Sequence, residues 1–125
     1  AARIDTLRKR YGGVPVTATE PVFGYMAEAL GLTMRNMRFQ LAQMNDTEPR
    51  ASDIAAFEAD LRGRKVKVMF HNTQTTEGLT TRLLNIAKAS GVSVVGVTET
   101  MPHGMTYVAW MNTQLDALEQ ALARQ

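Results

Sequence analysis

The sequence predicts a three-layer α/β sandwich, with about four parallel strands in one sheet and helices covering both faces of that sheet. The first observation behind this prediction is that short apolar runs, rich in β-branched residues, alternate with longer segments of helical apolar spacing. The second is that the connections between successive strands are long enough for right-handed parallel crossovers. The third is that several helical segments are followed by glycine, which is typical of helix C-termini.

The composition is that of one globular domain. The chain has 125 residues, of which 45% are hydrophobic and 21% charged, and its net charge is only +2. Because the charges are mixed in sign and form no polybasic arm, we expect no nucleic-acid partner. No apolar run approaches the roughly 20 residues that a membrane span needs. The lack of cysteine excludes disulfides and thiolate metal ligands.

The first part of the chain predicts a helix, a strand and a second helix. Residues 3–11 read as a short basic helix that stops at Gly12. Residues 14–17 form a β-branched strand, and the next helix begins at Pro21, because a first helical position tolerates proline. That helix runs to about Leu30, before a glycine. Its apolar stripe consists of Phe23, Met26, Ala27 and Leu30.

The next part predicts a weaker strand and a third helix. Residues 37–41 read as the strand, and residues 45–49 read as a polar loop. Ser52 is expected to cap the helix, which Gly63 ends. The core-facing residues of this helix are Ile54, Phe57 and Leu61.

A third strand is predicted over residues 66–70, followed by the polar segment 71–78. Thr75 or Thr76 is expected to cap the following helix, and Gly91 closes it. The apolar face of that helix consists of Leu79, Leu83, Ile86 and Ala87.

The last strand is predicted over residues 92–97, the most apolar run in the chain, as expected for a strand covered on both faces. A final helix begins at about Thr106. Its core seam is predicted to consist of Val108, Met111, Leu115, Leu118 and Leu122.

Three candidate ligands follow predicted strands. Glu20, His71 and Glu99 each come just after a strand, and in open parallel sheets the ligand crevice lies beyond the carboxyl ends of the strands. We therefore expect the three on one rim. Each has a simpler reading: Glu20 as a carboxylate at a helix N-terminus, Glu99 as a solvated loop acid, and His71 as a cap or a support beside the site. His103, between proline and glycine, reads as an exposed surface histidine.

Several segments match one known family in order and spacing. They are residues 14–19, 20–25, 29–32, 53–54, 70–72, 91–92, 98–99, 104–107 and 115–118, with Met111. In these segments the chain resembles the carboxyl-terminal lobe of the zinc/manganese-type periplasmic solute-binding proteins of metal ABC transporters. The resemblance covers nearly the whole chain. It implies that residues 1–13 are the end of an interlobe helix with its linker, and that residues 14–125 are the metal-binding lobe.

The resemblance also implies a site and a function. Glu20 and Glu99 fall on the positions of two of the family's four metal ligands, although relatives usually carry aspartate at the second position. The other two ligands are histidines of an amino-terminal lobe, for which the chain has no counterpart. The implied function is binding Zn²⁺ or Mn²⁺ as the transported ligand and delivering it to a membrane permease. It further implies a monomer in the periplasm or at the cell surface, with no organic cofactor and no catalysis.

Two alternatives come from other classes of protein. A small α/β hydrolase or phosphatase could use Glu20 and Glu99 as acid and base, but the chain has neither a Gly-x-Ser-x-Gly elbow nor a cysteine. A receiver-like or nucleotide-binding signalling domain is the other alternative. No glycine-rich phosphate loop follows any predicted strand, which argues against it.

Overall fold

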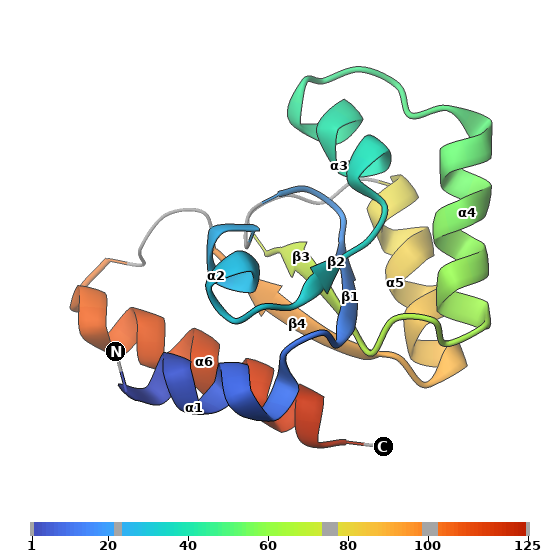
Figure 1. Ribbon diagram of the computed structural model, residues 1–125. Helices are drawn as coiled ribbons and strands as arrows, with labels where there is room; N and C mark the ends of the chain where they lie inside the picture. Colours follow the sequence, from blue (N-terminus) through green and yellow to red (C-terminus); the bar gives the residue numbers. More distant parts are fainter. Residues whose placement is uncertain (1, 22–23, 74–77, 99–102, 125) are drawn as a thin grey trace.

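The computed structural model describes the chain except for residues 1, 22–23, 74–77, 99–102 and 125. One sheet of four strands lies at its centre, and every neighbouring pair in it is parallel (Figure 1). Across the sheet the strands are β2 (Thr33–Met34), β1 (Pro15–Ala18), β3 (Val68–Asn72) and β4 (Ser93–Val97). The predicted four-stranded parallel α/β fold is therefore confirmed.

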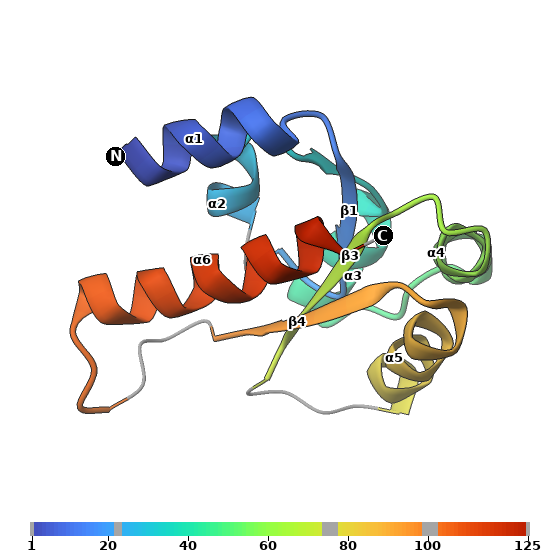
Figure 2. The same ribbon diagram turned by 90° about the horizontal axis from the view of Figure 1, so that it is seen from below.

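Helices cover both faces of the sheet, as the two views show (Figures 1 and 2). The first face carries α1 (Ala2–Tyr11), α2 (Gly24–Ala29) and α6 (Tyr107–Ala123). The second carries α3 (Met37–Met44), α4 (Ala51–Arg62) and α5 (Gly78–Ser90). No helix in the described part of the chain combines the length and the apolar character needed to cross a membrane.

Each face has its own hydrophobic core because side chains along a strand alternate between the two faces. In β3, Val68 and Phe70 belong to the core beneath α1, α2 and α6, whereas Met69 belongs to the core beneath α3, α4 and α5. All three are fully buried. In the second core the rings of Phe39 and Phe57 meet edge to face, with centroids 4.8 Å apart. This pair attaches α3 to α4.

The position predicted for the second strand is wrong. Residues 37–41 form the first half of α3, and the second strand is the two-residue β2. Apolar residues at positions 37, 39 and 41 imitate the alternation of a strand, but only Phe39 is buried, while Met37 and Leu41 are 43% and 42% exposed. Asn36 has a left-handed backbone, with φ of 66°, and turns the chain out of β2 into the helix.

Three smaller predictions about helix ends also differ from the structure. Helix α2 begins at Gly24, and Pro21 lies in the turn before it. The N-cap of α4 is Arg50 instead of Ser52, because the Arg50 carbonyl already accepts from the amides at positions 53 and 54. Val108 is 66% exposed, since the first turn of α6 lies beyond the end of β4 (Figure 2). The expected caps Thr75 and Thr76 lie outside the described residues.

The other predicted helix ends agree with the structure. Gly63 follows the last residue of α4, and Gly91, with φ of 80°, follows α5. The Thr106 hydroxyl caps α6 by accepting a 3.1 Å hydrogen bond from the amide of Ala109. Leu118 is fully buried at the centre of that helix, as its seam predicts.

Candidate functional site

The carboxyl ends of the three longer strands lie together at one edge of the sheet. Ala18 pairs with Phe70 across β1 and β3, and Asn72 pairs with Val97 across β3 and β4. Glu20 lies two residues beyond Ala18, and Glu99 lies two residues beyond Val97 in the sequence. Glu99 itself is outside the described residues, but Thr98, which precedes it, is at this edge.

Glu20 is half-buried and follows directly on the ladder of β1. The amide of Thr19 donates a 3.2 Å hydrogen bond to the carbonyl of Phe70, which extends the pairing of the two strands beyond Ala18. The described part of α2 begins at Gly24, and Pro21 lies in a turn, so Glu20 precedes that helix in the chain. Its alternative interpretation as a carboxylate near the helix N-terminus stays a prediction.

His71 lies within β3, so the prediction that it follows the strand is wrong. It pairs with Gly96 of β4. A Cβ atom added to Gly96 would lie 3.4 Å from His71 Nε2, so the imidazole lies next to the position that a side chain at residue 96 would occupy. The pKa of His71 is lowered from its ordinary value of 6.5, chiefly because the ring is partly buried and also because Lys88 is positively charged. The imidazole is therefore neutral at pH 7, the form that binds metals.

Two other polar groups lie at this edge and are not among the ligands predicted from the sequence. Asn72 ends β3 and is only 1% exposed, and a polar residue that closes a buried apolar strand is the signal that could have identified it. Thr73 follows, and both its amide and its hydroxyl donate to the carbonyl of Val97, at 3.0 and 3.3 Å. These bonds hold the ends of β3 and β4 together.

Helix α6 supports the position just before Glu99. The indole Nε1 of Trp110 donates a 2.7 Å hydrogen bond to Thr98 Oγ1. The amide of Thr98 donates to the side-chain oxygen of Gln114 at 3.4 Å, and Gln114 is 8% exposed. The backbone leading to Glu99 is therefore attached to a helix that packs on the sheet.

The edge offers carboxylate, imidazole and amide groups, which are donors suited to Zn²⁺ or Mn²⁺. Within the described residues, no three His, Asp or Glu side chains come close enough together to hold a metal ion. The described part of the edge is thus at most a partial set of ligands. His103 is exposed, as predicted, and it precedes Gly104.

A family model described as zinc-uptake complex component A, periplasmic, matches residues 2–121 of the chain. A search of the curated proteins gave no match.

Solved structures share the fold. The laminin-binding protein Lbp of Streptococcus pyogenes matches with a TM-score of 0.67 and 17% identity, over 97% of this chain and 46% of that protein. The periplasmic zinc-binding protein TroA of Treponema pallidum matches with a TM-score of 0.65 and 20% identity, over 98% and 46%. FpvC of Pseudomonas aeruginosa, solved in complex with Mn²⁺, matches with a TM-score of 0.58 and 16% identity, over 98% and 48%. This chain thus spans about half the length of these proteins.

Proposed function

Because the chain belongs to the family of periplasmic zinc-uptake components, whose model matches residues 2–121, we propose that it is the carboxyl-terminal lobe of a two-lobed metal receptor. Residues 14–125 would form the metal-binding lobe, and residues 1–13 would be the end of the interlobe helix with its linker. The observation that carries this proposal is the extent of the structural match: it covers 98% of this chain but only 46% of TroA. The remaining half of such a receptor would be the amino-terminal lobe.

Contacts of α1 support its assignment as a helix fixed to this lobe. Leu7 is 3% exposed and lies in the core beneath α1, α2 and α6. Arg3 forms ion pairs with Asp116 and Glu119 of α6, at 2.5 and 3.2 Å. Figure 2 shows α1 and α6 on the same side of the sheet. A helix held in this way would carry an amino-terminal lobe in a fixed orientation.

We propose Glu20 and Glu99 as the two ligands that this lobe contributes, because both follow strands whose ends share one edge. His71 is the third candidate, and its neutral imidazole suits ligation. Its place inside β3, beside Gly96, favours a role in supporting the ligands over direct coordination. Two further ligands would come from the amino-terminal lobe.

The proposed cargo is Zn²⁺ or Mn²⁺. TroA is a zinc-binding protein and FpvC was solved with Mn²⁺, and carboxylate with imidazole suits either ion. Zinc would bind more tightly on intrinsic affinity, since the divalent series rises from manganese to copper and zinc remains well above manganese.

The proposed receptor works as a monomer outside the cytoplasmic membrane and passes its cation to an ABC permease without chemical change. The family description, with its uptake complex and periplasmic location, supports this role. The comparisons give no support to the alternative of a small hydrolase using Glu20 and Glu99 as acid and base.

Calorimetric titration of Zn²⁺ and Mn²⁺ tests the proposal, with this chain and the full two-lobed protein measured side by side. The chain alone should bind weakly, because two carboxylates complete only part of a four-ligand shell. The full protein should bind tightly, and Glu20→Gln or Glu99→Gln should weaken both. Glu48→Gln, in an exposed loop, is the matched control.

Two results would contradict the proposal. Tight binding by this chain alone, unchanged in Glu20→Gln and Glu99→Gln, would reject the partial-site assignment. Negligible binding by the full protein would reject the receptor role.

A further inference from the structure

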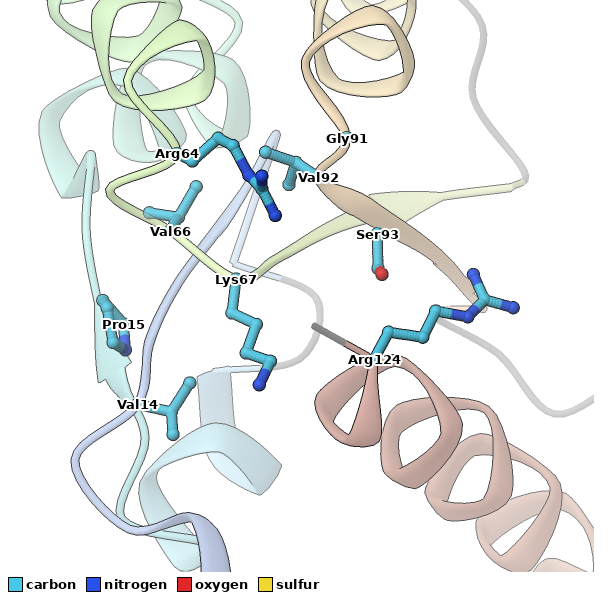
Figure 3. Close-up of a pocket in the computed structure, with 9 residues that line it drawn as sticks. All are labelled: Val14, Pro15, Arg64, Val66, Lys67, Gly91, Val92, Ser93 and Arg124. Carbon is cyan, nitrogen blue, oxygen red and sulfur yellow. The ribbon is translucent and has the colours of Figure 1, made fainter.

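A second feature lies at the opposite edge of the sheet, where the strands begin. A pocket of about 440 Å³ opens there between the segments that lead into β1, β3 and β4 (Figure 3). Its volume is within the range of small-molecule sites. A neighbouring hollow of about 380 Å³ shares Ser93 and Arg124 with it and adds Lys88.

Positive charge dominates the lining of both hollows. The lining of the larger pocket includes Arg64, Lys67 and Arg124. Among the described residues, no Asp or Glu lines either hollow. The ion pairs between described residues engage other cations, namely Arg3, Arg35, Arg62 and Arg82. The cations of this pocket are therefore not neutralised by described carboxylates.

Helix dipoles account for only part of this charge. Arg64, Gly91 and Arg124 follow the C-termini of α4, α5 and α6, where backbone carbonyls carry partial negative charge. Each helix end amounts to roughly half an elementary charge, so three full positive charges exceed what the helix ends can offset. The pocket retains a net positive character.

Arg64 occupies a backbone conformation that usually belongs to glycine. Its φ is 53°, directly after the cap of α4. Its side chain lies across the entrance to β4: a Cβ atom added to Gly91 would be 3.9 Å from Arg64 Nε and Cζ. A glycine at position 64 would suit this backbone better, so the turn itself does not require an arginine.

We propose that this pocket binds a phosphate monoester. Arg64, Lys67 and Ser93 line the pocket and carry the guanidinium, ammonium and hydroxyl donors that a phosphoryl dianion accepts. In Figure 3 the Lys67 ammonium extends away from the Arg64 guanidinium, toward Val14, so the lysine stem must turn for both groups to meet one phosphoryl group. The side chain of Arg124 extends away from the other two cations and reinforces the field from the side. Val14, Pro15, Val66 and Val92 provide an apolar floor for the organic part of the ester.

This site does not depend on the proposed metal receptor, because it is at the other edge of the sheet. The test is an NMR titration of the isotope-labelled chain with phenyl phosphate, at constant ionic strength set by sodium chloride. Saturable shifts are expected at the amides of Lys67, Gly91, Val92 and Ser93. Inorganic phosphate should bind more weakly because it lacks the apolar part, and phenol should not bind because it lacks the charge.

Substitutions separate binding from fold stability. Lys67→Gln and Arg64→Gly should each weaken phenyl phosphate about tenfold, the usual effect of losing a charge-assisted hydrogen bond. Arg64→Gly should not lower the midpoint of thermal unfolding, because glycine tolerates the left-handed backbone. If Arg64→Gly does lower the midpoint, Arg64→Gln takes its place in the binding test, because glutamine keeps part of the aliphatic stem. Arg38→Gln, an exposed cation on α3, should bind as the unchanged chain does.

Several outcomes would overturn the inference. Amide shifts that grow without saturation, or that persist in both Lys67→Gln and the Arg64 variant, would mean that phenyl phosphate is attracted only by general surface charge. Equal affinity for inorganic phosphate would make free phosphate the ligand and reject the ester. Equal shifts with phenol would mean that the pocket binds the aromatic ring alone and does not recognise the phosphoryl group.

Discussion

Trp110 and Thr98 connect helix α6 to the residue that follows β4, through a 2.7 Å hydrogen bond from the indole Nε1 to Thr98 Oγ1. Thr98 directly precedes Glu99, one of the two proposed ligands. Trp110 is the only tryptophan of the chain, so its fluorescence reports on this edge alone.

The first prediction uses this reporter. Adding Zn²⁺ to the chain should change the fluorescence emission of Trp110, and the change should saturate only at high Zn²⁺ concentration. The reason is that a cation bound to Glu99 alters the electric field and the mobility next to Thr98. Glu99→Gln and Glu20→Gln should each diminish the change, whereas Glu48→Gln in an exposed loop should not. A response of full size in both site variants would place the cation elsewhere.

A second prediction concerns the space between β3 and β4. A Cβ atom added to Gly96 would lie 2.5 Å from Thr73 Cγ2, far closer than two carbons can approach, so one of them must move. Gly96→Ala should therefore cost about 1 to 3 kcal/mol of unfolding free energy, the usual effect of overpacking. Urea denaturation measures this loss.

The control is a double-mutant cycle with Thr73→Ser, which deletes the γ-methyl group and keeps the hydroxyl that donates to the Val97 carbonyl. Most of the loss in Gly96→Ala should disappear when Thr73→Ser is present. Additive effects of the two changes would show that Thr73 is not what excludes a side chain at Gly96.

The sequence was sufficient for the architecture because the longer elements carry strong periodic patterns and clear stops. Gly63 and Gly91 mark two helix ends, and the apolar β3 and β4 segments could be identified as strands. Strand β2 was not predictable in the same way, since its two residues are held by pairing with β1 and not by any pattern of their own. The exposed Met37 and Leu41 imitate a strand that tertiary structure does not form.

The candidate site was predictable only to the level of the sheet edge. Parallel topology places residues that follow strands at one edge, so Glu20 could be assigned there from its position after β1. The bond between Trp110 and Thr98 depends on where α6 lies against β4, which no spacing along the chain encodes. The position of His71 inside β3 depends on how far the ladder with β4 extends.

A third prediction tests the core beneath α6. Leu118 is fully buried, so Leu118→Ala should cost about 2 to 5 kcal/mol, because the sheet and helices cannot close the cavity completely. Val108 belongs to the same apolar seam in sequence but is 66% exposed, and Val108→Ala should change stability by no more than about 0.5 kcal/mol. Chemical denaturation of both variants checks this contrast, and similar losses would contradict the placement of the first turn of α6.

The last prediction is a pH dependence that arises where α4 meets α5. Glu58 is 9% exposed and accepts from Arg82 Nε at 2.9 Å and from an Arg62 guanidinium nitrogen at 3.1 Å. The hydrogen bond from Arg82 is the main reason why the pKa of Glu58 is lowered in the folded chain; burial opposes it, and the remaining contributions of the two arginines reinforce it.

Since the folded pKa lies below the unfolded value of about 4.3, the stabilisation by Glu58 is complete above that value. It is lost as the pH falls through the folded pKa, because protonation then costs the folded state an ion pair that the unfolded state does not have. The difference in unfolding free energy between the unchanged chain and Glu58→Gln should therefore be constant from pH 7 to about 5 and should shrink below pH 4.3. Urea denaturation across this range measures the difference, with Glu48→Gln, in an exposed loop, as the matched control. A difference that stays constant down to pH 3 would mean that Glu58 contributes through its shape and not through its charge.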